Sequence, residues 1–240
     1  MQHEHEHTTE AIVKRLVVGP KINYLRDWVY GGIDGAVTTF AIVAGAIGAE
    51  LSTGIVLVLG IANLLADGFS MAAANYAGTK AEIDDYNRLR AMEERHIDLF
   101  PEGEREEIRQ IYKLKGYRGS QLERLVSLIT GKKENWIDTM LNEEHGLSNV
   151  LRSPVKSALA TFAAFVLCGG VPLLPFVIEP VSAPLVATCI TGAVFFGIGS
   201  VKSHWSTGRW YFSGLETTLI GMSAASIAWG VGYMLQGFAQ

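Results

Sequence analysis

The fold is decided by a long run without a charged residue, SALATFAAFVLCGGVPLLPFVI, at positions 157–178. An α-helix needs about 20 residues to cross the ~30 Å of hydrocarbon in a bilayer, and this run is long enough. Backbone groups inside lipid must be satisfied within the segment, so the run is expected to be helical. It therefore predicts a transmembrane helix.

Four further stretches of similar length carry at most one charge each. The composition of the whole chain is also typical of a membrane protein. Hydrophobic residues make up 49% of the chain and charged residues 18%, with a mean hydropathy of +0.23. A typical soluble domain is about 25% charged. The net charge of −4 means that the chain has no excess of basic residues, which excludes nucleic acid as a partner. The expected partner is the lipid bilayer. We expect an all-α membrane protein with five spans, at about 29–49, 52–79, 156–178, 183–204 and 212–236.

A polar module, residues 80–152, lies between the second and third spans and holds 15 of the 24 acidic and 13 of the 20 basic residues. Its apolar residues recur at helical spacing, and Pro101, Gly116–Gly119 and Gly131 are typical of breaks between helices. No stop signal separates the second span from residues 82–99, so one helix could continue from the membrane into the module. The expected domains are 1–27 (a polar N-terminal segment), 28–79 (two spans), 80–152 (the module) and 153–240 (three spans).

The basic residues predict the orientation, because all 20 fall on one side of this topology. Four precede the first span, fourteen lie from Lys80 to Lys156, and Lys202 and Arg209 lie between the fourth and fifth spans. The positive-inside rule then places the N-terminus and the module in the cytosol. The C-terminus is expected on the opposite side of the membrane. This membrane is expected to be either a plasma membrane or a vacuole-like membrane. The polar N-terminal segment lacks the apolar core of a signal peptide, so no cleavable signal is expected.

Two acidic residues within the predicted spans are candidates for function. An ionised carboxylate such as Asp34 or Asp67 costs several kcal/mol in lipid unless it is paired, hydrated or protonated. Asn63, Asp67 and Met71 are spaced i, i+4, i+8, which puts an amide, a carboxylate and a thioether on one helical face. Adding a soft thioether to oxygen ligands favours a transition metal such as Fe²⁺. Asp27, seven residues before Asp34, is either an acid at the entrance or a solvated surface residue.

Small residues surround Asp34. Gly31 with Gly35, and Gly32 with Ala36, form pairs four residues apart that let two helices approach closely. The close contact could lie within the chain or between two copies of it.

The polar module contains three pairs of potential ligands, each spaced to face one way on its helix. Carboxylate, imidazole and thioether groups together describe a site for a divalent transition metal. Taken singly, each pair is also typical of a solvated helix face. The pairs are Glu93 with His96, Glu104 with Glu107, and Met140 with Glu144.

Four motifs make the chain resemble the vacuolar iron transporter family, over nearly all of the sequence from Arg26 on. The resemblance implies a homodimer with five spans per subunit, and an ion path between the subunits lined by the first two spans. It also implies a cytoplasmic three-helix metal-binding domain, and export of Fe²⁺, often also Mn²⁺, from the cytosol by proton antiport. The motifs are RDWVYGGIDG (26–35), GIANLLADGFSM (60–71), WIDTMLNEEHGL (136–147) and VPLLP (171–175).

The resemblance also implies roles for single residues. The family's pore aspartate falls on Asp34, its pore methionine on Met71, and its aspartate at the mouth of the first span on Asp27. Two positions depart from the family pattern. His96 and Asn63 stand where better-known members have glutamates, and Asp67, one turn after Asn63, could supply the missing carboxylate. The family's ligands in the soluble domain fall on Glu93, His96, Glu104, Glu107, Met140 and Glu144.

Two other functions remain open from the residues alone. Glu93 and His96 form half of a ferritin-like di-iron motif, but an iron oxidase would need a second Glu-x-x-His within the module, and residues 80–152 contain none. A metal sensor without transport would leave Asp34 and Asp67 inside the membrane without a role. A transporter that is not an enzyme is therefore expected. The histidines and glutamates at 3–7 could bind metal weakly, although a solvated tail is the simpler interpretation.

Overall fold

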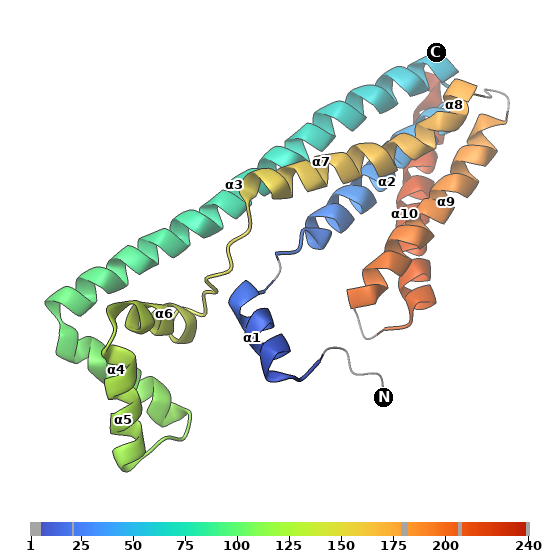
Figure 1. Cartoon of the computed structure of the whole chain (residues 1–240). Helices are drawn as coiled ribbons and strands as arrows, with labels where there is room; N and C mark the ends of the chain where they lie inside the picture. The colour runs from blue at the N-terminus through green and yellow to red at the C-terminus, as the bar shows by residue number, and fades with distance from the viewer. Residues whose placement is uncertain (1–5, 21, 179–181, 206–207, 239–240) are drawn as a thin grey trace. The chain divides into compact units, whose positions relative to one another are not determined.

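A computed structural model describes residues 6–20, 22–178, 182–205 and 208–238 of the chain (Figure 1). Within these residues every regular element is helical, as the composition predicts. Most of the His/Glu stretch at 3–7 lies outside the described residues. The α-helices are α1 (Thr9–Val18), α2 (Leu25–Gly48), α3 (Thr53–Leu99), α4 (Pro101–Leu114), α5 (Gly119–Thr130), α6 (Lys133–Glu143), α7 (Pro154–Gly170), α8 (Leu174–Ile178), α9 (Ala183–Lys202) and α10 (Trp210–Leu235). Three short 3₁₀ turns complete the order, at Val171–Leu173 (η1), Ser203–Trp205 (η2) and Gln236–Phe238 (η3).

Among the residues that the structure describes, five helical segments are long and apolar enough to cross a membrane, which confirms the predicted number. Each lies within a few residues of its predicted position, apart from the extension of α3. Four of the segments are α2, α9, α10 with η3, and the first part of α3. The fifth is Pro154–Ile178, which combines α7, η1 and α8.

The fifth segment is not one regular helix, which the sequence analysis did not anticipate. Proline has no N–H for the helical ladder, and its ring clashes with the preceding turn. Pro172 and Pro175 therefore convert the end of the span into the 3₁₀ turn η1 and the short helix α8. Pro172 and Leu173 remain buried there, so the break lies inside the packed structure.

Helix α3 is a single helix of 47 residues, as the missing stop signal predicted. Its first part is apolar, and its last turns carry Glu93 and His96. It ends at Leu99, where Pro101 begins α4. The chain forms two compact units, which divide within α3 between Gly78 and Thr79. The apolar unit comprises 23–78 and 154–240, and the polar unit comprises 1–22 and 79–153.

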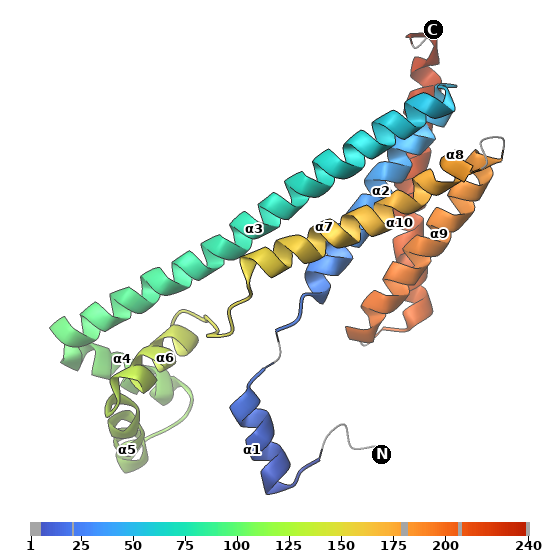
Figure 2. The same ribbon diagram turned by 45° about the horizontal axis from the view of Figure 1, so that its top comes forward.

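The apolar unit is built around α2, which packs against α7, α9 and α10, and its core includes Phe40, Phe165 and Phe195. Figures 1 and 2 both show α9 and α10 side by side. Helices α2 and α7 touch through glycines. A Cβ on Gly31 would lie 2.2 Å from the carbonyl oxygen of Thr161, and one on Gly35 would lie 2.4 Å from that of Phe165. The small residues around Asp34 therefore serve a close contact within the chain.

The polar unit has its own apolar core. Helix α4 contributes Ile108, α5 contributes Leu122 and Val126, and α6 contributes Trp136 and Ile137. Within each helix the core residues lie three or four positions apart, as Leu122 and Val126 do on α5 and Trp136 and Met140 do on α6, which gives each short helix one buried face. The last turns of α3 complete the core, so the site-bearing part of α3 is held by three packed helices.

Candidate metal-binding sites

The turn between α3 and α4 brings the first group of potential ligands together. Glu93 and His96 lie one turn apart on α3, and Glu104 follows on α4. His96 Nδ1 is 3.2 Å from Glu104 Oε1, and the three residues offer ligand atoms within 4.8 Å of one another. One imidazole and two carboxylates at this separation can coordinate one divalent ion.

A second group shares Glu93 with the first. The end of α6 supplies Glu144 and His145, whose backbone N–H groups both donate to the carbonyl of Met140. His145 Nε2 lies 2.9 Å from Glu93 Oε1, and ligand atoms of Glu93, Glu144 and His145 again lie within 4.8 Å of one another. His145 was not predicted. The only signal for it was its position directly after Glu144.

Burial makes this cluster unlike an ordinary acidic surface. The side chains of Glu93 and Glu104 are almost completely buried, with 2% and 6% of their surface exposed. The Oε2 atom of each is buried and has no hydrogen-bond partner among the described residues. An unpaired carboxylate oxygen in such surroundings is costly, and a bound cation offsets that cost.

The charges of the cluster act on one another. Burial, together with the nearby carboxylates of Glu107, Glu93 and Glu144, raises the pKa of Glu104 to about 7. Burial also raises the pKa of Glu144, while His145 opposes that rise. Glu107 therefore lies close enough to contribute to the field, although its side chain is exposed. A site crowded with negative charge is one that a divalent cation stabilises.

Met140 differs from the other predicted ligands of the module. Its side chain is fully buried, and it belongs to the apolar core of the polar unit. The structure brings five potential ligands into the two groups, which are Glu93, His96, Glu104, Glu144 and His145. Met140 is one turn before Glu144 on α6, as its spacing predicts.

In the apolar unit Asp27 is a buried residue of the first turn of α2. Asn75 Nδ2 donates to Asp27 Oδ1 at 2.9 Å and to Thr161 Oγ1 at 2.7 Å. The Thr161 hydroxyl lies 3.3 Å from the Asp27 carbonyl. Asp27 is therefore tied to α3 and α7, and it is not a solvated surface acid. Asn75 and Thr161 were not predicted, although Asn75 continues the line of Asn63, Asp67 and Met71 by one more turn.

The other predicted residues of the spans lie on α2 and α3. Asp34 and Asp67 are both partly buried, and they are close enough for their charges to interact. Met71 is partly buried and packs against the core of the apolar unit. Asn63 Nδ2 is buried and has no hydrogen-bond partner within the part of the chain that the structure describes. The first two spans therefore carry two carboxylates and an amide group without a hydrogen-bond partner among the described residues.

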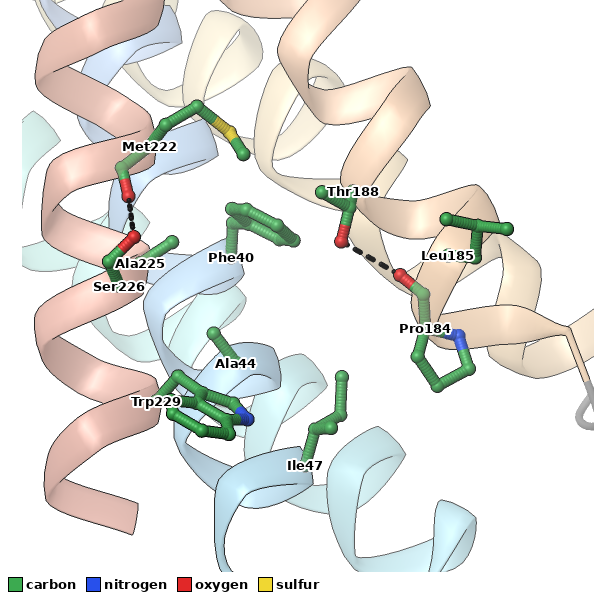
Figure 3. Close-up of a pocket in the computed structure, with 10 residues that line it drawn as sticks. All are labelled: Phe40, Ala44, Ile47, Pro184, Leu185, Thr188, Met222, Ala225, Ser226 and Trp229. Atoms are coloured by element: carbon green, nitrogen blue, oxygen red, sulfur yellow. Dashed lines mark hydrogen bonds between the residues drawn. The ribbon is translucent and has the colours of Figure 1, made fainter. Parts of the chain in front are cut away.

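A separate cavity of about 390 Å³ opens between α2, α9 and α10 (Figure 3). Phe40, Met222 and Trp229 line it. Its two hydroxyl groups each donate to a carbonyl of their own helix, Thr188 to Pro184 and Ser226 to Met222, both at 2.8 Å. The lining residues include no carboxylate or imidazole, so the cavity does not have the chemistry of a cation site.

Comparison with known proteins agrees with the motifs. A sequence model described as the VIT family matches residues 25–233. A vacuolar iron transporter of Centaurea cyanus is 31% identical over 210 residues, 86% of each chain. One of Toxoplasma gondii is 33% identical over 226 residues, which cover 89% of this chain and 75% of the relative. Vacuolar iron transporter 1 of Arabidopsis thaliana is 32% identical over 215 residues, 88% of this chain and 86% of the relative.

Proposed function

The chain belongs to the VIT family, and we propose that it exports Fe²⁺ from the cytosol, with Mn²⁺ as a second substrate, by proton antiport across a homodimer. The relatives are named as iron transporters, and five apolar helical segments make the chain a multi-pass membrane protein. The observation that carries the proposal is the ligand cluster of the polar unit. One buried oxygen of Glu93 and one of Glu104 lack a hydrogen-bond partner among the described residues, and the other oxygen of each lies next to an imidazole.

In the first step the polar unit collects the ion from the cytosol. Glu93, His96 and Glu104 bind one position, and Glu144 with His145 extends the site on the other side of Glu93. Imidazole ligands suit Fe²⁺, and carboxylate ligands suit Mn²⁺. Glu107 adds negative charge at the exposed edge, which raises the local concentration of cations. We assign Met140 a supporting position behind Glu144.

In the second step the ion crosses the membrane between the two subunits, along a path lined by the first two spans of each. Asp34 and Asp67 supply carboxylates, Met71 a thioether and Asn63 an amide, all on α2 or α3. Asp27, held by Asn75 and Thr161, lies on the cytosolic side of Asp34 in the proposed orientation. Protonation of the carboxylates from the far side then weakens their hold on the ion, which gives exchange of metal for protons.

Two features support a dimer. Little of the membrane segment of α3 is covered by the rest of the chain. Yet this helix carries Asp67, which is only partly buried and whose contact with lipid would be costly. A second copy against α3 would remove this carboxylate from lipid and bring two sets of carboxylates together. The basic residues favour a cytosolic polar unit in this dimer.

The test is metal flux in proteoliposomes that contain the full chain, with Fe²⁺ or Mn²⁺ as the substrate. We expect flux that increases with an opposing proton gradient and is almost abolished in Asp34→Asn. Asp84→Asn, which changes an exposed carboxylate of α3, is the matched control and should retain wild-type flux. Folded protein that binds Fe²⁺ but moves no ion, with or without the proton gradient, would contradict transport and would favour a sensor.

A further inference from the structure

Helix α1 has an apolar face that the rest of the chain leaves exposed. Ile12, Val13, Leu16 and Val17 fall within about 140° of the helix circumference. Leu16 and Val17 are 72% and 81% exposed, and none of the ten residues of α1 is buried. These apolar residues lie within the N-terminal segment 1–27, which was predicted to be polar.

The helix is nevertheless well defined at both ends. The Thr8 side chain accepts a hydrogen bond from the N–H of Ala11, which caps the start. Gly19 adopts φ +69°, a conformation that favours glycine, and ends the helix. An isolated helix of ten residues is marginal in water, even when it is capped. A surface that covers the apolar face would stabilise it.

We propose that α1 lies flat on the cytosolic surface of the bilayer, as an interfacial helix beside the entry of the first span. Only six residues, 19–24, separate α1 from α2. Extended at ~3.5 Å per residue, this connection reaches about 20–25 Å. Because α2 crosses the membrane, α1 cannot leave the neighbourhood of the bilayer surface.

The charges of α1 fit a lipid surface better than a protein groove. Lys14 and Arg15 lie on the side of the helix away from Leu16, and both are exposed. A helix in this position would hold its apolar residues among the acyl chains and its basic residues among anionic headgroups. Glu10, in the first turn, is the one acidic residue among the ten residues of α1.

The inference goes beyond transport and does not depend on which ion is carried. An interfacial helix fixes the depth at which the first span enters the membrane, and thus the depth of Asp27 and Asp34. It also makes this depth sensitive to the charge of the lipid. Removal of the apolar face would loosen the start of α2 without a change at any proposed ligand.

The test is the depth of spin labels in the full chain, reconstituted into phosphatidylcholine vesicles with phosphatidylglycerol. Single cysteines replace Val13, Lys14, Leu16 or Val17 in a background with Cys168→Ala and Cys189→Ala. Frequent collision of the spin label with oxygen indicates that the label lies in lipid. Frequent collision with a water-soluble nickel chelate indicates that it lies in water. We expect the oxygen-to-nickel ratio to be several-fold higher at positions 13, 16 and 17 than at 14.

Two results would overturn the proposal. Equal exposure to the nickel chelate at all four positions would place α1 in water. Shielding of position 16 from both reagents would mean that protein covers the face, either the chain itself or a second copy.

Lys14→Gln/Arg15→Gln is expected to lower the ratio at Leu16 in anionic vesicles, and vesicles of phosphatidylcholine alone provide the control. These readouts need no flux, so they can fail while the transport proposal stands.

Discussion

Glu93 is the residue on which both ligand groups depend, because each of them includes it. Its side chain is buried, and one of its oxygens has no hydrogen-bond partner among the described residues. We expect Glu93→Gln to weaken Fe²⁺ and Mn²⁺ binding by roughly tenfold or more, as losses at metal sites commonly do. Isothermal titration of the full chain in detergent measures this.

The variant also separates a ligand from a structural residue. An amide removes a buried charge, so the metal-free protein should melt no lower than wild type. Glu94→Gln is the control, since Glu94 is the next residue and lies 3.6 Å from Arg90 at the surface. Unchanged affinity in Glu93→Gln, or equal losses in the two variants, would contradict a shared ligand.

Glu104 gives the metal-free protein a pH dependence with a definite sign. Its pKa is raised to about 7 by burial and by nearby carboxylates, from 4.5 in an unperturbed glutamate. The folded state therefore favours the protonated form. The stability linked to Glu104 is fully present below pH 4.5 and is lost as the pH rises to about 7.

We therefore expect the melting temperature of the metal-free protein to contain a term that falls across this pH range and is absent in Glu104→Gln. Glu106→Gln is the control on the same helix, because hydrogen bonds from Gln110 and Arg109 lower the pKa of Glu106. If Glu104 did not cause this fall, the melting temperatures of the wild type and of Glu104→Gln would depend on pH in the same way. Saturating Mn²⁺ should abolish the difference in slope between them.

At the same scale, periodicity predicted some of the potential ligands that the structure brings together and missed others. The i, i+3 and i, i+4 rules identify residues on one helical face, which is why Glu93, His96 and Glu104 could be proposed from spacing. His145 directly follows Glu144, so in a regular helix it would point about 100° away. The end of α6 turns it back toward Glu93, and no spacing rule describes that turn.

At the scale of helices, hydropathy predicted the five spans because each must satisfy its backbone inside lipid. It could not predict which helices touch, since that depends on side-chain shape across the bundle. The contact of α2 with α7 is the clearest case. Gly31 and Gly35 were recognised as small residues, but only the fold identifies α7 as their partner. The break at Pro172 was also missed, because hydropathy is insensitive to the lost N–H group.

The α2–α7 contact leads to a prediction about stability. A Cβ at position 35 would lie 2.4 Å from a carbonyl oxygen, so Gly35→Ala must push the two helices apart. We expect it to lower the free energy of unfolding by about 1–3 kcal/mol, as overpacking does. Gly197→Ala is the matched control on α9, where the added Cβ meets no atom within 4 Å. Unfolding in mixed detergent micelles measures both, and equal stability would contradict the close contact.

At the scale of the whole molecule, the exposed side of α3 is the feature that the single chain leaves unexplained. Beside Asn63 and Asp67 runs a row of small exposed residues at four-residue spacing, Ala62, Ala66, Ser70 and Ala74. Such rows let two helices approach closely within a membrane. In the proposed dimer this row meets the partner, so that neither copy of Asp67 contacts lipid.

The dimer can be tested by cross-linking at this row. We expect Ser70→Cys, in a background without Cys168 and Cys189, to form disulfide-linked dimers in native-like membranes. Leu219→Cys on α10 is the control, because Leu219 is an exposed apolar residue on a helix that the dimer does not need. Similar cross-linking at both positions would mean random collision, and none at position 70 would exclude α3 as the interface.

Because Asp34 and Asp67 interact within one chain, dimer formation through α3 would place four carboxylates around one path. A group of that charge holds a divalent ion only when few of its members are protonated, which links the dimer to proton-coupled release.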